Sequence, residues 1–491
     1  MYTFSSKLKT FSLILMAVGL LGIGYGFYSA PKDIQEVEAL LAADSHGGHG
    51  EATHATPAEE HSATAVADHA TPVKAEAAHK DTTHAAAEVS HETAGDSVHA
   101  APVAAHDAQA NAVAHDAHAD AEHKEHLEHV LHQLSNKPWA AVYVACIFFM
   151  LLSLGTLAFY AIQQVAQAGW SPVLFRVMQG ITAYLPVGSV IFFIILVLCG
   201  LHFNHLFIWL DPEVVAHDKL IQTKSGYLNF PFWIVRAAIF LLGWNAYRYF
   251  SRKNCLAQDE SDDNSFYKKN FKMSALFLVF FIVTESIMSW DWIMSIDPHW
   301  FSTLFGWYVF ASFFVSGITT ICMVTLYLKS KGYLEHVNTS HIHDLAKFMF
   351  GISVFWTYLW FSQFMLIWYA NIPEEVTYFV TRIQQYNLPF FGAVVMNFLF
   401  PLLILINTDF KRITWVLVMA GTVILLGHYV DFFNMIMPGT VGDQWFIGIP
   451  EIASVLFFLG LFIYVVFTAL TKAPLLPKRN PFIEESKHFH Y

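Results

Sequence analysis

The chain has 491 residues, of which 55% are hydrophobic and only 13% are Asp, Glu, Lys or Arg. Soluble globular proteins contain about 25% charged residues, so this composition excludes an ordinary water-soluble enzyme and indicates a membrane protein. The formal net charge is -12, but 19 of the 39 acidic residues and only four of the 27 basic residues lie in residues 31–136. The remaining chain is slightly basic, and nothing in it indicates nucleic-acid binding.

Ten apolar runs are long enough to cross the apolar core of a bilayer, which takes about 20 residues of helix. They lie at about residues 11–29, 139–164, 182–203, 230–250, 272–295, 301–328, 342–370, 386–407, 411–436 and 449–470. With this topology, eighteen Lys and Arg lie on the side of the N-terminus and three lie in the short loops of the other side. Because short cytoplasmic loops collect basic residues, we predict an all-α integral membrane protein of about ten transmembrane helices with both termini in the cytoplasm.

The first apolar run has two interpretations. It follows a basic start at Lys7 and Lys9 and ends in small residues, which is typical of a secretory signal peptide. However, the run is long, Pro31 follows the cleavage position, and no cysteine is present there for lipid attachment. We therefore expect residues 1–30 to form a retained N-terminal transmembrane helix.

Residues 31–136 contain no Phe, Trp or Tyr and are rich in Ala, His, Thr, Asp and Glu. Such a segment buries too little apolar surface to offset its ordering entropy, so we predict a disordered periplasmic insertion. Sixteen of the 26 histidines lie in it. Four recur at three-residue spacing, which places neighbouring imidazoles on adjacent helix positions and makes them weak candidates for metal binding: His123, His126, His129 and His132. The alternative, which the irregular spacing of the other histidines favours, is a solvated tether that ends in a short helix.

Two segments share a pattern that indicates an internal repeat. DWIMSIDP at 291–298 and DFFNMIMP at 431–438 share an Asp, an aromatic residue, an Ile and a final Pro at the same offsets. We predict two four-helix bundles, at 137–300 and 301–437, followed by a C-terminal helix and cytoplasmic tail at 438–491. Only eight positions align, so coincidence is the alternative.

Charged side chains within a bilayer are costly and usually face a protein interior or a water-filled cavity. Glu285 lies near the middle of the fifth predicted span, with no opposite charge within a helical turn. It suits a proton carrier that is neutral part of the time, and the alternative is a permanently protonated carboxyl bonded to a neighbouring helix. Asp291 and Arg236 lie at similar depth, so we expect them to form an ion pair.

His428 and Asp431 lie three residues apart on the ninth predicted span and therefore share one face of the helix. A carboxylate beside an imidazole orients the ring and raises its basicity, which is the arrangement that proton transfer requires. A polar pair that only fixes helix packing has the same sequence pattern. Asn434 is a further candidate member of this group.

Other polar residues near the outer membrane face are candidates for a quinone pocket or for ion pairs. Arg236 is one, Glu451 at the start of the tenth span is another, and His202 and His205 end the third span. Because an acid at a helix N-terminus also complements the helix dipole, capping is the alternative for Glu451.

Most intramembrane acids and histidines thus lie between mid-membrane and the outer face, which predicts an outward half-path for protons. Only neutral side chains continue inward: Tyr184, Asn245, Tyr358 and Asn397. The four cysteines are scattered singly and only His428 is clearly buried within a span. The sequence therefore offers no ligand set for a cysteine-bound cluster or a pair of haems in this chain.

Several segments together resemble a known family. The start KLKTFSLILMAVGLLGIGYGFYSAP, the core segment MSWDWIMSIDPHWFSTLFGWY and the helix GHYVDFFNMIMPG resemble the F subunits of alternative complex III. This complex is a bacterial quinol:cytochrome c oxidoreductase, and its C and F subunits are similar to the NrfD or polysulfide-reductase membrane subunits. The resemblance covers residues 11–29 and 137 to about 475.

The resemblance implies a subunit of the bacterial inner membrane without a covalently bound cofactor. Its partners would be iron–sulfur, c-type haem and paralogous NrfD-like subunits, and menaquinol would be the candidate quinol. The role carried over is proton transfer toward the periplasm, for which we assign Glu285, Asp291, His428 and Asp431 from membrane depth. Two other classes remain open: a stand-alone ion-coupled transporter and a purely structural membrane anchor.

Overall fold

The computed structural model describes residues 2–47 and 104–490. By their contacts these residues form two units, one of residues 2–36 and 128–490 and one of residues 37–47 and 104–127. The described residues form helices and no strand, which confirms the all-α prediction. The α-helices are α1 (Ser6–Ser29), α2 (Ile34–Gly47), α3 (Ala104–Val165), α4 (Phe175–Ile181), α5 (Tyr184–Gly200), α6 (Pro212–His217), α7 (Lys219–Lys224), α8 (Phe230–Gln258), α9 (Ser265–Trp292), α10 (Phe305–Ser330), α11 (Thr339–Ala370), α12 (Pro373–Gln384), α13 (Asn387–Val394), α14 (Phe400–Leu405), α15 (Thr414–Val441), α16 (Ile449–Leu470) and α17 (Ile483–Lys487).

Shorter helical turns connect several of these helices. Four are 3-10 turns and one is a π-helical turn within the eighth predicted span. They are η1 (Pro172–Leu174), η2 (Ile208–Leu210), η3 (Met294–Ile296), η5 (Phe410–Arg412) and the π-helical η4 (Val395–Leu399).

Nine helical segments of the described chain are long and apolar enough to cross a membrane, as expected of a multi-pass membrane protein. The fourth predicted span is the exception. It forms α8, a helix of 29 residues, but Arg236, Arg248 and Arg252 interrupt its apolar sequence. α8 packs against α5 and α9, and its crossing of a membrane stays a prediction.

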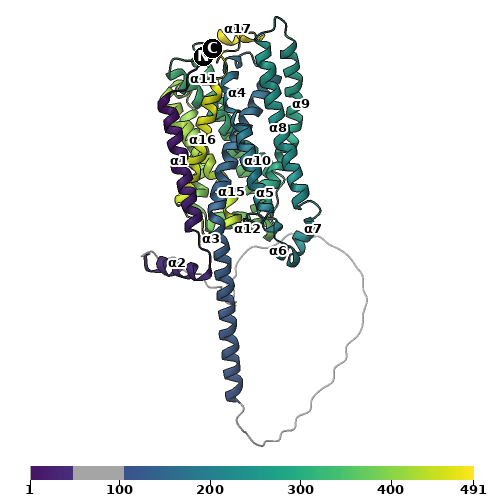
Figure 1. The fold of residues 1–491 in the computed structure, drawn as a ribbon, viewed down its shortest axis with the longest axis vertical. Coiled ribbons are helices and arrows are strands. Elements are labelled where there is room, and N and C mark those ends of the chain that lie inside the picture. The colour runs from purple at the N-terminus through teal and green to yellow at the C-terminus, as the bar shows by residue number, and fades with distance from the viewer. Residues whose placement is uncertain (1, 48–103, 491) are drawn as a thin grey trace, which may run out of the picture. The chain divides into compact units, whose positions relative to one another are not determined.

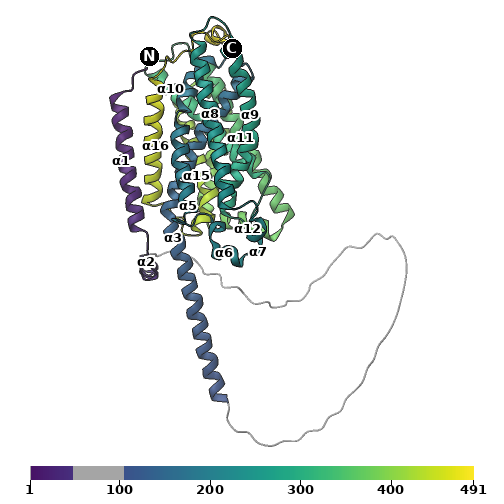
Figure 2. The ribbon, with the colours of Figure 1, turned by 45° about the vertical axis from the view of Figure 1, so that its right-hand side comes forward.

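Figures 1 and 2 show the helices of the larger unit running along one another. The ring of Tyr2 packs on that of Tyr333 at 5.1 Å, and Asn338 donates a hydrogen bond of 2.6 Å to the carbonyl of Phe489. Both ends of the described chain therefore lie at one end of these helices. The opposite end carries α6, α7 and α12 and is called the α12 end (Figures 1 and 2).

α1 lies beside α16 in both views (Figures 1 and 2). Glycines allow the two backbones to approach closely, because a Cβ at Gly19 would lie 2.4 Å from the backbone nitrogen of Phe457. A Cβ at Gly22 would lie 2.5 Å from that of Ala453. The first apolar run is thus an integral part of the packed helices in this structure.

Helices extend into both ends of the segment that the sequence predicts to be an insertion. Residues Ile34–Gly47 form α2, and α3 begins at Ala104 rather than near residue 139. Both segments are rich in Ala, Glu, Leu and Gln, which favour a helix even without tertiary packing. The central part of the predicted disordered insertion, residues 48–103, lies outside the described residues.

Candidate functional site

The carboxylate of Asp431 lies buried between three helices. It belongs to α15 and accepts hydrogen bonds from the hydroxyl of Tyr308, from Ser312 Oγ at 2.8 Å and from Trp356 Nε1 at 2.8 Å. Tyr308 and Ser312 are four residues apart on α10, and Trp356 lies on α11, so α10 and α11 supply the donors that meet α15. All three donors are uncharged.

His428 lies one turn before Asp431 and is also buried. Its Nδ1 is 3.8 Å from Asp431 Oδ2 and 2.9 Å from Ser312 Oγ, so the serine hydroxyl bridges the two side chains. Because Ser312 has one proton and donates it to Asp431, the network assigns a proton to His428 Nδ1 and a free lone pair to Nε2. Nε2 is buried and has no hydrogen-bond partner, so it can accept a proton or a hydrogen bond.

A second polar group without a partner lies against this turn of α15. Asn397 is in the π-helical turn η4, is fully buried, and neither atom of its amide has a hydrogen-bond partner. A Cβ at Gly427 would lie 2.1 Å from Asn397 Oδ1. Such unsatisfied buried groups are rare in folded proteins, and π-helical turns are frequent at functional sites.

Arg382 of α12 is also buried, and it contacts α15 close to the C-terminal side of Asp431. Its guanidinium lies 3.3 Å from the ring centre of Tyr378, and its Nε donates a hydrogen bond of 3.0 Å to the carbonyl of Asn434. Proline has no backbone N–H, so Pro438 leaves this carbonyl without its partner within α15. Arg382 thus satisfies an acceptor that the helix cannot.

Two cavities beside this network are both lined by Tyr378 and Arg382. A cavity of about 70 Å³ is lined by Asp297, Tyr378 and Arg382 among others. A second of about 10 Å³ shares Tyr378 and Arg382 and also contacts Tyr308. A single water needs about 10–15 Å³, so the small cavity is large enough for one water and the larger one for several. Polar groups and cavities therefore follow one another from Asp297 to Asp431.

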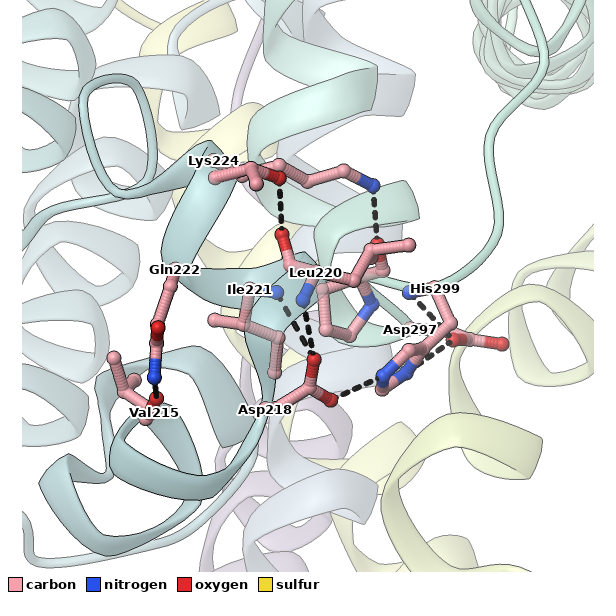
Figure 3. Close-up of polar contacts among 10 residues, drawn as sticks. Val215, Asp218, Leu220, Ile221, Gln222, Lys224, Asp297 and His299 are labelled. Carbon is pink, nitrogen blue, oxygen red and sulfur yellow. Dashed lines mark hydrogen bonds and ion pairs between the residues drawn. The ribbon is translucent and has the colours of Figure 1, made fainter.

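The loop that contains Asp297 is tied to the α6–α7 segment (Figure 3). Asp218 Oδ2 lies 2.5 Å from His299 Nε2, and Lys224 Nζ donates a hydrogen bond of 2.5 Å to the carbonyl of Pro298. Asp218 also caps α7 by accepting from the backbone N–H of Leu220 and Ile221. These contacts hold one wall of the larger cavity in place.

The other predicted proton-transfer residues lie in separate environments. Arg236 Nε and Nη2 donate to Asp291 at 2.7 and 3.0 Å, so the expected ion pair is present. Glu285 is buried, with Oε2 bonded to Ser286 Oγ at 3.1 Å and Oε1 without a partner. The structure therefore joins His428 to Asp431 but places Asp291 in a closed pair and Glu285 apart.

The residues predicted to form a quinone pocket or ion pairs do not gather at one site. Glu451 Oε2 accepts the backbone N–H of Gly448 at 2.8 Å and so caps α16. His202 is exposed in a left-handed backbone conformation with φ 60°. His205 faces His132, with ring centres 5.5 Å apart. Arg236 belongs to the ion pair with Asp291.

The weak metal candidates on α3 are likewise not assembled into a site by their helical spacing. The described residues contain no group of three or more His, Cys, Asp or Glu side chains placed to hold a metal ion. The sidechains of His123, His126 and His129 are exposed. Helical spacing alone therefore does not converge these imidazoles on one point.

Sequence reasoning missed Tyr308, Ser312 and Trp356, because their contacts depend on how α10 and α11 pack on α15. It counted Arg382 as a loop charge. The spacing of Tyr378 and Arg382, four residues apart after Pro373, was the available signal that this charge belongs to a helix. No protein-family model matches the chain, and no curated protein matches it.

Proposed function

We propose that this chain is the proton-transferring membrane subunit of a quinol:cytochrome c oxidoreductase of the alternative complex III type. It moves protons from the interior of the helices to the α12 end, which we place on the periplasmic side. The observation that carries the proposal is the buried chain of hydrogen bonds from His428 through Ser312 and Asp431 to Tyr308. It ends at cavities that reach Asp297.

Each residue has a defined part in the transfer. A proton arrives at His428 Nε2, and the imidazole releases its Nδ1 proton to Ser312, whose own proton moves to Asp431. Tyr308 then exchanges protons between the Asp431 carboxyl and the small cavity. Arg382 stays charged, because guanidinium is not deprotonated in proteins, and its charge holds polar groups at the cavity wall.

The proposal assigns proton transfer to this chain and quinol oxidation to the assembly. Asn397 and His428 present unpartnered polar atoms that suit a hydrogen-bonding ligand, but the cavities described above do not reach Asn397. Iron–sulfur and haem groups of the partner subunits would carry the electrons. Menaquinol is the candidate substrate that the resemblance implies. The proposal assigns its binding to the assembled complex and not to this chain alone.

The test is turnover and proton release by the intact complex in proteoliposomes. Asp431→Asn keeps an acceptor oxygen but removes the carboxyl that can take up a proton, and Glu285→Gln does the same at the isolated carboxyl. We expect Asp431→Asn to lower proton release at least about tenfold, the smallest effect typical of losing a proton-transfer group. Asp443→Asn, at an exposed carboxylate just after the end of α15, is the control. Equal assembly with unchanged proton release in Asp431→Asn would reduce the chain to a structural anchor.

One observation favours a second function, ion-coupled transport. The eighth predicted span consists of α13, the π-helical turn η4 and α14 rather than one regular helix, and the amide of Asn397 is unpartnered there. π-helical turns within helices are frequent at functional sites, and an unpartnered amide there suits the binding of a transported ion. Ion flux by the purified chain alone in liposomes would support this function over the first.

A further inference from the structure

Two histidines from different parts of the chain meet at the α12 end of the larger unit. His132 belongs to α3, and His205 lies in the loop between α5 and η2. Their ring centres are 5.5 Å apart, and the ring planes are at 82°. Both line a cavity of about 480 Å³ that also contacts His129 and Asp211.

The backbone around His205 is fixed to α3. Asn136, one turn after His132, donates from Nδ2 to the carbonyl of His205 at 3.2 Å and accepts from its N–H at 3.0 Å. Asn136 is buried. This reciprocal pair of hydrogen bonds sets the position of one imidazole relative to the other without engaging either ring.

The geometry of the two rings matches that of imidazoles bound to one ion. With Zn–N bonds of about 2.1 Å at a tetrahedral angle, the ring centres lie about 5 Å apart. Asp211 Oδ2 lies 3.7 Å from His205 Nδ1, whereas two donors on one tetrahedral zinc lie about 3.4 Å apart. Asp211 Oδ1 accepts the N–H of Glu213 as the cap of α6, which leaves Oδ2 available.

The site is accessible from solution. Exposed fractions of 41% for the His205 side chain and 30% for Asp211 leave the site open to an ion from solution.

We propose that His132, His205 and Asp211 form a binding site for a divalent transition metal ion, with Zn²⁺ as the expected ligand. The described side chains are not yet placed around one ion, and rotation of the two rings and of the Asp211 carboxylate brings the three donors together. Water completes the coordination, or His129 does so from one turn earlier on α3. Imidazole with one carboxylate suits zinc, whereas Mg²⁺ and Ca²⁺ prefer oxygen ligands. The site does not depend on the proton path.

The experiment measures thermal unfolding of the full chain in detergent, purified without a histidine tag, with and without Zn²⁺. A ligand that binds only the folded state raises the melting temperature. Zinc held between α3 and the His205 loop should therefore raise the Tm, and Mg²⁺ should not. The variants below separate zinc bound at this site from zinc bound by other histidines of the chain.

The decisive variant is His132→Ala with His205→Ala, which should abolish the rise in Tm. His123→Ala with His126→Ala removes the same number of imidazoles from the same helix and should retain it. Asp211→Asn keeps a capping oxygen and should weaken zinc affinity by about tenfold or more, as loss of even a second-shell partner does. No rise in the native chain, or a full rise in the His132 and His205 variant, would overturn the proposal. His132 is exposed, so His132→Gln alone decides if the double variant does not fold.

Discussion

Arg236 closes on Asp291 through two hydrogen bonds, of 2.7 and 3.0 Å, whereas Asp431 is held by uncharged donors. The two aspartates begin the two matched segments of the sequence. Arg382, the arginine near Asp431, stacks on Tyr378 and donates to backbone carbonyls instead. The first aspartate is therefore paired with a cation, whereas the hydrogen-bond donors of the second are all uncharged.

This contrast gives an expectation for stability. Replacing Arg236 by Leu leaves Asp291 buried without its cation, and breaking a buried pair from one side costs about 3–5 kcal/mol. We expect a matching fall in the free energy of unfolding, measured by thermal and denaturant unfolding in detergent. Replacing Asp291 by Asn as well removes the uncompensated charge and should recover part of the loss. A double variant less stable than Arg236→Leu would argue against pairing as the cause.

Tyr308 is the residue that connects Asp431 to the small cavity. Tyr308→Phe keeps the ring and removes the hydroxyl, so a hydrogen bond to a carboxylate worth about 1.5–3 kcal/mol is lost. On our proposal, proton release slows while assembly of the complex persists. The measurement is proton release in proteoliposomes at equal assembly, with Tyr369→Phe as the control because Tyr369 is 84% exposed. Equal rates in both variants would exclude Tyr308 from the route.

The packing of α1 on α16 can be tested with a matched pair of glycines. A Cβ added at Gly19 would lie 2.4 Å from the backbone nitrogen of Phe457, so Gly19→Leu places a side chain where there is no room. A Cβ added at Gly24 would have no neighbouring atom within 4 Å. We expect Gly19→Leu to separate the helices and lower the Tm, and Gly24→Leu to have little effect. Equal effects would contradict close packing as the reason for the glycines. The mass of the mature chain decides between a retained helix and a cleaved signal peptide.

Sequence was most informative for contacts within one helix. The spacing of His428 and Asp431 predicts their shared face, and the structure places their side chains 3.8 Å apart. The long apolar runs likewise predict the helices, because a run of about 20 apolar residues is the length that a membrane-spanning helix requires. Membrane depth also suggested Arg236 as the partner of Asp291, since few charges compete for it.

Contacts between helices could not be predicted in the same way. Trp356 on α11 donates a hydrogen bond to Asp431 on α15, and the ring of His205 packs against that of His132 on α3. Both contacts depend on how the helices pack, which a single sequence does not specify. For Glu451 the structure shows the capping alternative that the sequence already offered, since its carboxylate accepts the backbone N–H of Gly448. The sequence predicts a helical span at 230–250, and α8 begins at Phe230 as expected but continues to Gln258.

The hydrogen bond between Asp218 and His299 should make the stability of the α6–α7 segment depend on pH (Figure 3). The backbone N–H of Ile221 lowers the pKa of Asp218 below its ordinary value of 3.8, and the bond to His299 lowers it further. A carboxylate whose pKa is depressed in the folded state stabilises it above the unfolded pKa, and this contribution disappears as the pH falls through the folded value.

We therefore expect pepsin to cleave residues 211–228 faster as the pH falls below about 4, the ordinary pKa of an aspartate, because the folded state takes up this proton only below that value. Asp218→Asn removes the titrating group, so its segment should be cleaved readily above this pH and change less as the pH falls. Comparing the two chains at each pH cancels the titration of other carboxylates and of the protease itself. Parallel pH profiles would show that Asp218 does not control this segment. A difference confined to the native chain would show that its charge, through His299 and the α7 cap, holds the wall of the larger cavity.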